Sequence, residues 1–450
     1  MMDTTPIAQF LAGHMFTALS LREFKSWENT GVIDLKPVSL VLGTNSSGKS
    51  SLIQSLLMLK QTEQSPDRAV HLNLGGDEQN DLFDFGDFDD VLRKGIKGDR
   101  RFEIALEFAT PNPESRVPKG RFNCIYSQDS SRAVVVNEWT LGTNTKVFQS
   151  IRRERGAYSI VVDDNVSSPV CKGRQYAPQR SVGLPPEAIA ALGMDGALVE
   201  DLSLLLRREL QSISYLGPLR RKPERDYTWN KTLPGAIEND GNRAIDVLLA
   251  NSQLKNSDQN RIIHGVSKWL AKMNIADSLE VKQTSSRYEV VITKNGIQSN
   301  LRDVGIGVSQ VLPVLTLAYF APEGTTIILE EPEIHLHPLA QSVLAELFVE
   351  ISQERNVQFI VETHSEHLFR RMQTLIARQT FDTEQVAMYF VENLDGNAQL
   401  RTLDVDDFGR VHNWPDGFFG DALGETREQT KLAIKRAKAL REKEHGHVSD

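Results

Sequence analysis

The chain has 450 residues, enough for several domains and at least one large hydrophobic core. Its 40% hydrophobic and 25% charged residues are typical of a globular protein and exclude a disordered or fibrous chain. The longest apolar stretch, residues 311–321, is about half a membrane span and contains Pro313, so no membrane partner is expected. Residues 1–9 lack the features of a secretory signal, which predicts a cytoplasmic protein.

The charge balance gives no overall attraction to nucleic acids or anionic lipids. Lys and Arg together number 51 against 60 Asp and Glu, a net charge of −9. Contact with DNA or RNA would therefore need local basic patches, and the sequence offers four of them, at residues 93–101, 152–155, 220–225 and 431–443. Such runs are also typical of solvated surfaces, so DNA and RNA stay open as partners.

The N-terminal region predicts a strand that leads through a glycine-bounded loop into a helix. Residues 38–42 are mostly apolar and end at a glycine. Residues 49–61 carry Leu52, Leu56 and Leu59 at helical spacing, with no proline or glycine between them. This order of strand, loop and helix is the one in which phosphate-binding loops occur.

The rest of the chain predicts a β-rich region, then helices, then alternating strands and helices. We expect strands at residues 102–108, 133–136 and 158–162, helices within 186–213, 244–255 and 261–275, and a hairpin over 279–294. Strand and helix alternate again over residues 301–375. The pattern predicts one α/β domain whose two sequence halves enclose a large insertion.

The loop at residues 43–50, GTNSSGKS, matches the phosphate-loop pattern in the required context between a strand and a helix. Its glycines let successive amide groups point inward, and the helix N-terminus adds its positive dipole end. Lys49 would neutralise the β- and γ-phosphates, and the Ser50 hydroxyl would coordinate Mg²⁺. The residues predicted to bind ATP are Gly43, Thr44, Asn45, Ser46, Ser47, Gly48, Lys49, Ser50 and Ser51.

Two adjacent carboxylates follow a second short apolar strand, residues 325–329. They are Glu330 and Glu331, and they precede Pro332. Neighbouring side chains at a strand end point in different directions, so one carboxylate can serve the metal while the other faces an attacking water. We assign Glu330 to Mg²⁺ and Glu331 to the water as general base.

A histidine follows a third apolar strand, residues 357–361. His364 lies three positions beyond this strand, in the run Glu362-Thr363-His364-Ser365. A histidine in this place can hydrogen-bond the γ-phosphate or the attacking water. We therefore predict His364 as a catalytic residue together with Glu331 and Lys49.

These motifs, in this order, resemble an ABC-type ATPase head. The phosphate loop, VGIGVSQVLP, IILEEPEIHLHP and FIVETHSEHL are similar to the branch that includes the SMC and RecF proteins and the overcoming-lysogenisation-defect nucleases. Within that branch the chain looks like stand-alone bacterial ATPases with YLGPLR before the signature and WPDGFF near the C-terminus. The resemblance implies an α/β fold with a mixed β-sheet and a large α+β insertion between phosphate loop and signature.

The resemblance also implies a homodimer in which two heads sandwich two ATP molecules. Each phosphate loop would then be completed by the signature of the other subunit, and residues 333–338 would cross the dimer axis. Such a pairing is isologous and predicts two-fold symmetry. Carried over position by position, the signature residues acting in trans would be Gly305, Gly307, Ser309 and Gln310.

Two residues depart from the family pattern, and two contacts of the pattern stay open. Gly305 stands where transport ATPases have a serine, and the metal carboxylate is Glu330 rather than aspartate. The glutamine that usually completes the metal site is not identified; Gln54, Gln61 and Gln79 are the candidates. The adenine contact is likewise open, with candidates Phe24, Lys25 and Trp27.

The sequence divides into four segments: residues 1–61 and 299–410 as the two halves of the head, 62–298 as the insertion and 411–450 as an extension with a basic helix. The function predicted is a Mg²⁺-dependent ATP hydrolase that switches between monomer and dimer. The resemblance implies a bacterial DNA-maintenance or anti-phage system in which the ATPase controls an effector protein, a nuclease or a toxin. Only 78 residues follow Met372, too few for a fused nuclease domain.

The motifs leave three alternative functions. A nucleotide-sensing scaffold would bind ATP and turn it over slowly. A transporter-associated ATPase is disfavoured because 257 positions separate Gly48 from Gly305, more than a compact transport head needs. A metallohydrolase is disfavoured because the ATPase assignment already explains most of its candidate ligands, which are Glu331, His335, His337, His364, Glu366 and His367.

Overall fold

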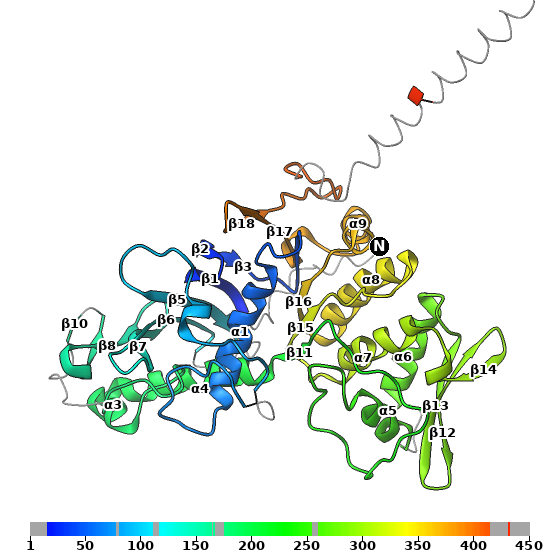
Figure 1. Cartoon of the computed structure of the whole chain (residues 1–450), viewed down its shortest axis with the longest axis horizontal. Helices are drawn as coiled ribbons and strands as arrows, with labels where there is room; N and C mark the ends of the chain where they lie inside the picture. Colours follow the sequence, from blue (N-terminus) through cyan, green and yellow to red (C-terminus); the bar gives the residue numbers. More distant parts are fainter. Residues whose placement is uncertain are drawn as a thin grey trace, which may run out of the picture. The chain divides into compact units, whose positions relative to one another are not determined.

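The computed structural model describes residues 16–77, 81–110, 117–163, 165–166, 175–253, 260–414 and 431–432. The chain divides into two compact units, Met1–Val411 and His412–Asp450. All of the named strands and helices lie in the first unit (Figure 1). Among the described residues, no helix has both the length and the apolar character that crossing a membrane requires.

A six-stranded mixed sheet unites the two halves of the sequence. Its order is β11 (Ser214–Leu216), β15 (Thr326–Glu330), β16 (Gln358–Glu362), β4 (Val38–Gly43), β17 (Val386–Leu394) and β18 (Asn397–Thr402). The first five strands are parallel and β18 is antiparallel. Because β4 lies between two strands from the C-terminal half, the sheet confirms the expected mixed α/β head with an insertion between its halves.

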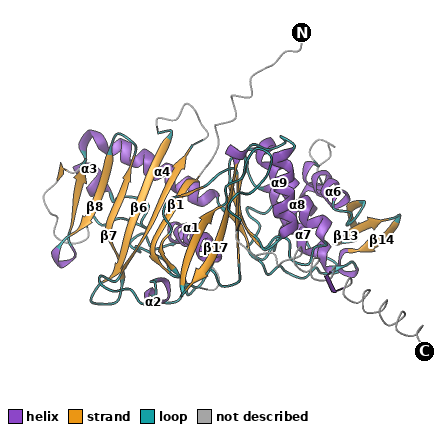
Figure 2. Ribbon diagram, turned by 90° about the horizontal axis from the view of Figure 1, so that it is seen from above, coloured by secondary structure: helices purple, strands orange, loops and turns teal. Residues whose placement is uncertain are grey.

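Helices cover both faces of this sheet, which explains why β4, β15 and β16 are buried at every position. On one face, Ile328 and Ile360 belong to the same core cluster as the apolar side chains of α1 (Lys49–Gln64). On the other face, Phe359 packs against Phe348 of α8 (Pro338–Arg355), with ring centroids 4.9 Å apart. Figure 2 shows α1 on the opposite side of the sheet from α7 (Ile306–Phe320), α8 and α9 (Glu366–Ala377).

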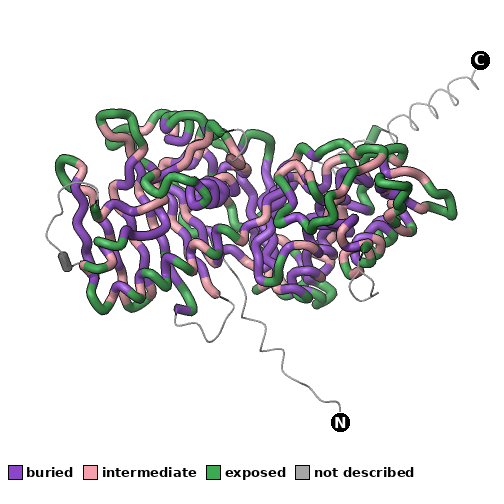
Figure 3. Tube along the Cα trace, turned by 90° about the horizontal axis from the view of Figure 1, so that it is seen from below, coloured by how far each residue is buried: buried purple, intermediate pink, exposed green. Residues whose placement is uncertain are grey.

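A nine-stranded antiparallel sheet joins strands from before and after the phosphate loop. It contains β1 (Phe16–Phe24), β2 (Trp27–Asn29), β3 (Ile33–Asp34), β5 (Arg101–Ala109), β6 (Lys119–Gln128), β7 (Val134–Gly142), β8 (Val147–Arg152), β9 (Tyr158–Val162) and β10 (Asn165–Val166). Burial alternates along β5, as expected for a strand with one face in a core. That face packs with α1 and with α4 (Gly196–Ser212). Figure 3 traces the buried positions along these strands.

The segment before the signature forms a small helical region beside a three-stranded sheet. The helices are α5 (Ala244–Ser252) and α6 (Arg261–Lys272), and the antiparallel strands are β12 (Ser278–Thr284), β13 (Arg287–Lys294) and β14 (Ile297–Asn300). Both α5 and α6 pack on α7. The remaining short helices are α2 (Phe88–Val91), α3 (Pro186–Ala191) and the 3₁₀ turns η1 (Glu154–Gly156), η2 (Gly193–Asp195), η4 (Leu301–Asp303) and η5 (Thr383–Gln385).

The expected elements occur close to their predicted positions. The strand over residues 158–162 agrees with β9, the hairpin over 279–294 agrees with β12 and β13, and the helix from Lys49 extends three residues further than predicted. Strands β6, β8, β17 and β18 were not predicted. Residues 415–419 of WPDGFF and, apart from residues 431–432, the basic stretch at 431–443 lie outside the described residues.

Candidate functional site

The loop between β4 and α1 has a backbone that two glycines permit. Gly43 has φ 154° and Gly48 has φ 111°, values that side chains with a Cβ rarely adopt. A Cβ on Gly43 would lie 2.2 Å from the Val391 carbonyl oxygen, so space excludes it as well. Helix α1 begins at Lys49 with no side-chain cap, which leaves its first amide groups available to an anion.

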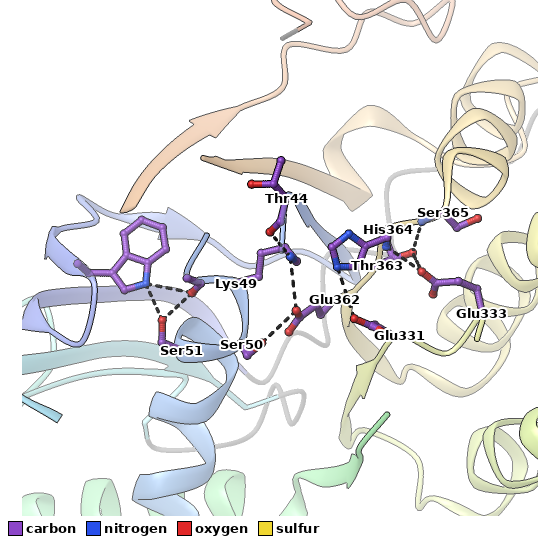
Figure 4. Close-up of polar contacts among 12 residues, drawn as sticks. Thr44, Lys49, Ser50, Ser51, Glu331, Glu333, Glu362, Thr363, His364 and Ser365 are labelled. Atoms are coloured by element: carbon purple, nitrogen blue, oxygen red, sulfur yellow. Dashed lines mark hydrogen bonds and ion pairs between the residues drawn. The ribbon is translucent and has the colours of Figure 1, made fainter. Parts of the chain in front are cut away.

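Lys49 is held inside the loop by two oxygen partners (Figure 4). Its Nζ donates a 2.7 Å hydrogen bond to the Thr44 carbonyl and lies 3.7 Å from Glu362 Oε1. The residue is only 3% exposed. Burial lowers the pKa of Lys49, and the nearby carboxylate of Glu362 opposes that shift. A buried ammonium with one carboxylate beside it is suited to neutralise a phosphate.

Ser50 and Ser51 open α1 in different directions. The Ser50 hydroxyl donates to Glu362 Oε1 at 3.0 Å. The Ser51 hydroxyl donates to the Gly48 carbonyl at 2.6 Å, and the Trp27 indole N–H donates to the Ser51 hydroxyl at 3.0 Å. Ser50 therefore faces the acidic strand ends, whereas Ser51 and Trp27 fix the turn of the loop.

Glu330 is the last residue of β15 and is buried. Its Oε1 accepts a 3.1 Å hydrogen bond from the Tyr215 hydroxyl, and its backbone carbonyl accepts one from Arg220 at 3.3 Å. Burial, together with the repulsion from Glu362, raises the pKa of Glu330 to about 7. The sequence predicted this carboxylate beside the metal, but not its contact with the Tyr215 hydroxyl.

Glu331 and His364 meet across the ends of β15 and β16. Glu331 Oε1 lies 3.4 Å from His364 Nε2. The Glu331 backbone has φ 44°, and its N–H donates to the Glu362 carbonyl at 2.8 Å. Burial and the positive charge of Lys49 lower the pKa of His364, so the imidazole is neutral at pH 7. Both side chains are partly exposed and reach the same opening.

Glu333 fixes the segment that carries His364. Its Oε1 accepts 2.7 Å hydrogen bonds from the Thr363 hydroxyl and from the His364 backbone N–H. The carboxylate is buried, which raises its pKa. Glu333, the first residue of the predicted loop 333–338, therefore attaches this loop to the strand end that positions His364 (Figure 4).

An open pocket of about 400 Å³ lies between the loop and the strand ends. The structure thus brings together most of the predicted residues, although Gly43, Thr44 and Glu330 do not line the pocket. Two lysines, Lys25 and Lys49, and two carboxylates, Glu331 and Glu362, are among its lining residues. The full lining is Lys25, Ser26, Asn45, Ser46, Ser47, Gly48, Lys49, Ser50, Ser51, Glu331, Glu362 and His364.

The signature residues lie away from this pocket. Gly305 is exposed at the start of α7, and Gly305 and Gly307 line a different opening of about 560 Å³ with His335 and His337. Ser309 and Gln310 are buried in α7, and the Ser309 hydroxyl donates to the Ile306 carbonyl. Within one chain, the phosphate loop and the signature are therefore not brought together.

The open candidates for the metal-site glutamine are engaged elsewhere. Both polar atoms of the Gln61 side chain bond the backbone of the loop at residues 73–83. The Gln54 carbonyl accepts from Lys25 Nζ at 3.1 Å, and Gln79 lies outside the described residues. Neither described glutamine lines the pocket.

Two of the three adenine candidates are excluded by burial. Phe24 and Trp27 are both 0% exposed, so neither ring can stack on a base. Phe24 belongs to the core of the antiparallel sheet. Lys25 does line the pocket, beside Ser26.

The donor set at the strand ends fits Mg²⁺. The Ser50 hydroxyl and the carboxylates of Glu330 and Glu362 are the hard oxygen ligands that this ion prefers. Oε2 of Glu362 is buried without a hydrogen-bond partner, as expected of an atom whose partner is a cation. Glu331, Glu362 and His364 also bring one ligand atom each within 4.8 Å of one another.

Sequence reasoning missed the contacts of Glu362, Tyr215, Arg220 and Trp27. Glu362 carried a usable signal, since it ends an apolar strand as Glu330 does. Tyr215 and Arg220 begin and end YLGPLR, which marked the segment without giving a role. For Trp27, nothing in the sequence indicates the hydrogen bond to the loop.

A parallel sheet whose β4 ends in a glycine-bent anion loop, with a lysine and carboxylates around one pocket, defines a P-loop nucleotide-binding protein. The chain belongs to the AAA ATPase domain family, whose model matches residues 15–215 and 228–369. A second model, described as a protein of unknown function, matches residues 382–429. None of the curated proteins compared with the chain matches it.

The solved structures similar to this chain include SMC heads at low identity. An SMC head bound to the C-winged helix domain of ScpA is 15% identical, covers 87% of this chain and 98% of its own, and has a TM-score of 0.42. The SMC head domain from Thermotoga maritima is 13% identical, with coverages of 87% and 100% and a TM-score of 0.38. A third, an SMC head with an extended coiled coil bound to the C-terminal domain of ScpA derived from Pyrococcus furiosus, is 13% identical, with coverages of 87% and 96% and a TM-score of 0.41.

The family match confirms that the motifs belong to an ATPase domain.

Proposed function

We propose that this protein is a Mg²⁺-dependent ATP hydrolase that works as a dimerisation switch. The observation that supports this function best is the meeting of Lys49, Glu331 and His364 around one pocket, from three separate segments of the chain. The pocket therefore contains an ammonium group that can neutralise phosphates, together with a carboxylate and a neutral imidazole that can deprotonate and orient a water molecule.

Each side chain has a role that its surroundings suit. The Lys49 ammonium exchanges its hydrogen bond to the Thr44 carbonyl for contacts with the phosphates, because it neutralises their negative charge. Glu331, partly exposed at the pocket, takes the proton of the attacking water as general base. His364 orients that water or the γ-phosphate by a hydrogen bond.

Ser50 and Glu330 are the residues predicted to hold Mg²⁺, which when bound neutralises charge on the β- and γ-phosphates.

The separation of signature and phosphate loop supports a site shared by two copies. Gly305 is exposed, and a Cβ there meets nothing within 4 Å, so this end of α7 is free to approach another molecule. In the proposed homodimer, Gly305 and Gly307 approach the partner's pocket directly, and Ser309 and Gln310, buried further along α7, complete the same signature. The arrangement is two-fold symmetric because each copy gives and receives the same surface.

The output of the switch is proposed to be a partner protein, an effector such as a nuclease or toxin of a DNA-maintenance or anti-phage system. A protein partner is favoured over DNA or RNA because acidic residues partly neutralise the basic patches. Arg93 pairs with Glu23, Arg100 with Asp89, and Arg225 with Asp303. A cytoplasmic location and the four-segment division of the chain, 1–61, 62–298, 299–410 and 411–450, belong to the same proposal.

Steady-state hydrolysis by the wild type and by Glu331→Gln tests the function. We expect the variant to lose about 10²–10⁴-fold in turnover, since it lacks the general base, and to keep its ATP affinity. It should also accumulate as an ATP-bound dimer in size-exclusion chromatography with light scattering.

A slow wild-type rate that Glu331→Gln barely changes would instead identify the nucleotide-sensing scaffold. A transporter-associated ATPase would require co-purification with a membrane protein.

A further inference from the structure

Glu330 and Glu362 are direct neighbours in the parallel sheet. They are register partners at the ends of β15 and β16, one step beyond the pair Leu329 and Val361. Side chains alternate between the faces of a sheet, so both carboxylates continue the row of Ile328 and Ile360. That row packs with α1, whose first turn carries Ser50. The sheet therefore places the carboxylates of Glu330 and Glu362 on the face that carries α1, whose first turn is where the metal is expected.

Of these two carboxylates, Glu362 is the one that reaches the phosphate loop. Its Oε1 accepts from the Ser50 hydroxyl at 3.0 Å and lies 3.7 Å from Lys49 Nζ (Figure 4). Glu330 instead bonds the Tyr215 hydroxyl and does not line the pocket. The serine predicted to hold the metal thus already contacts a carboxylate, and that carboxylate is Glu362.

The second oxygen of Glu362 carries an independent indication. The residue is 4% exposed, and its Oε2 has no hydrogen-bond partner. An unpaired carboxylate oxygen in this position is costly, because a buried charge needs a partner to replace water. Three further carboxylates lie close enough to repel it: Glu330, Glu331 and Glu333. A divalent cation would remove both the missing contact and the repulsion.

The engagement of Gln54 and Gln61 elsewhere leaves a protein ligand of the metal unassigned. Gln61 uses both polar atoms on the loop at residues 73–83, and Gln54 bonds Lys25. Glu362 stands within hydrogen-bond distance of Ser50 and faces the pocket. Glu362 therefore supplies a side-chain oxygen at the pocket beside Ser50, whereas Gln54 and Gln61 do not.

We propose that Glu362 is the carboxylate that would hold Mg²⁺ beside Ser50, and that its contacts with Lys49 and Ser50 position both side chains at the phosphate loop. The proposal rests on the proposed ATPase function. With Mg²⁺ and nucleotide bound, Glu362 would have a cation other than Lys49 as its positive partner, and Lys49, now 3.7 Å from Glu362 Oε1, would be available to the phosphates. Glu330, the neighbouring strand-end carboxylate that bonds the Tyr215 hydroxyl, would be a second oxygen ligand for that ion.

The experiment measures metal and nucleotide binding rather than turnover. ATP affinity is determined by calorimetry with Mg²⁺ and again with EDTA, for the wild type, Glu362→Gln and the control Glu366→Gln. Glu366 lies in the first turn of α9 and pairs with Arg370, outside the pocket. Mn²⁺ binding in the presence of ATP is followed by electron paramagnetic resonance.

We expect Glu362→Gln to weaken Mn²⁺ binding about 10–100-fold and to lose the gain in ATP affinity that Mg²⁺ gives the wild type. In EDTA, the variant should bind ATP at least as tightly as the wild type, because Lys49 is freed and one negative charge is removed. Glu366→Gln should match the wild type in every measurement. Glu362→Asp keeps the charge but shortens the side chain, so its Mn²⁺ affinity should lie between those of the wild type and Glu362→Gln.

Unchanged Mn²⁺ binding and an unchanged effect of Mg²⁺ in a folded Glu362→Gln would overturn the assignment. If that variant melts early, the same comparison on Glu362→Asp decides. A wild type that binds ATP equally with and without Mg²⁺ also contradicts the proposal. Failure of the wild type to bind ATP at all would instead contradict the proposed function, so the two failures are distinguishable.

Discussion

The Ser50 hydroxyl donates a 3.0 Å hydrogen bond to Glu362 Oε1, although 312 positions separate the two residues. The bond joins the first turn of α1 to the end of β16, the strand that lies between β15 and β4. It connects the phosphate loop to the strand that leads directly to His364. The phosphate loop, the carboxylate proposed to hold Mg²⁺ and His364 are therefore connected through one hydrogen bond and one strand.

The glycine at the start of α1 should be sensitive to substitution for two separable reasons. Gly48→Ala places a Cβ at φ 111°, 2.6 Å from the Ser26 hydroxyl oxygen and 3.0 Å from the Ala398 Cβ. Gly76→Ala is a matched control, because Gly76 has φ 112° and nothing within 4 Å of its Cβ. Strain alone costs about 1–3 kcal/mol, so both variants should melt at lower temperature.

Only Gly48→Ala should also weaken ATP binding, by about tenfold or more, because the crowded Cβ displaces the loop. Calorimetric titration of both variants with ATP checks this. Equal ATP affinities for Gly48→Ala and Gly76→Ala would show that the close approach at Gly48 is unimportant for the pocket.

Trp27 should act on nucleotide binding from a fully buried position. Its indole N–H donates to the Ser51 hydroxyl at 3.0 Å and to the Gly48 carbonyl at 3.2 Å. Trp27→Phe leaves these acceptors without that donor, which costs about 1–3 kcal/mol and loosens the loop. We expect a lower melting temperature and an ATP affinity reduced roughly tenfold.

Trp269→Phe provides the comparison. Trp269 is equally buried and donates to the Tyr319 hydroxyl at 3.0 Å, in the helical region that contains α6 and α7. It should lose similar stability with no change in ATP affinity. A matching loss of affinity in both variants would mean that the effect of Trp27→Phe is general destabilisation.

The phosphate loop was predictable because everything it needs lies in eight consecutive residues with a strand before and a helix after. Glu331, the proposed general base, and His364 were also singled out from their places at strand ends, and the structure brings their side chains to within 3.4 Å. Local sequence was sufficient in each case because a parallel sheet gathers the carboxyl ends of its strands at one edge.

The partners of these residues were not predictable in the same way. The contact between Ser50 and Glu362 depends on β16 lying beside β4, and strand order is not encoded in either segment. The pairing of β1 with β5 has the same origin, since alternation along β5 shows which face is buried but not which strand is its neighbour. The exclusion of Phe24 from the adenine site follows from that pairing, because it places the ring in the core.

Glu209 should make the stability of the protein fall as pH rises. It lies near the end of α4, 5% exposed, and its Oε2 has no hydrogen-bond partner. Burial raises the pKa of Glu209 from 4.5 to about 8. Between these values the folded chain keeps a proton that the unfolded chain releases, so the free energy of unfolding decreases from about pH 4.5 to pH 8 and then levels.

Glu209→Gln removes that titration and should stabilise the protein at pH 9 by roughly 1–3 kcal/mol relative to the wild type, with little difference at pH 5. Urea unfolding at both pH values measures the effect, and Glu200→Gln, at an exposed position of α4, is the control. If the difference in free energy of unfolding between the wild type and Glu209→Gln is the same at pH 5 and pH 9, the Glu209 carboxylate is already ionised in the folded chain.

The shared site of the proposed dimer can be tested by mixing two inactive proteins. Lys49→Ala removes the phosphate-binding ammonium, and Gly305→Glu places a negative charge at the exposed start of α7, where a Cβ meets nothing within 4 Å. Each homodimer should be inactive. In a heterodimer, one pocket combines both defects, whereas the other pairs an intact phosphate loop with an intact signature.

Equal mixing gives heterodimers in about half of the pairs, each with one working pocket, so the mixture should recover about a quarter of the wild-type hydrolysis rate. Differently tagged chains, co-expressed and purified through both tags, show that exchange has occurred. A site contained within one chain predicts a different outcome: Gly305→Glu alone stays active and the mixture shows only its contribution. Purified heterodimers without activity would equally contradict a pocket completed by the partner's signature.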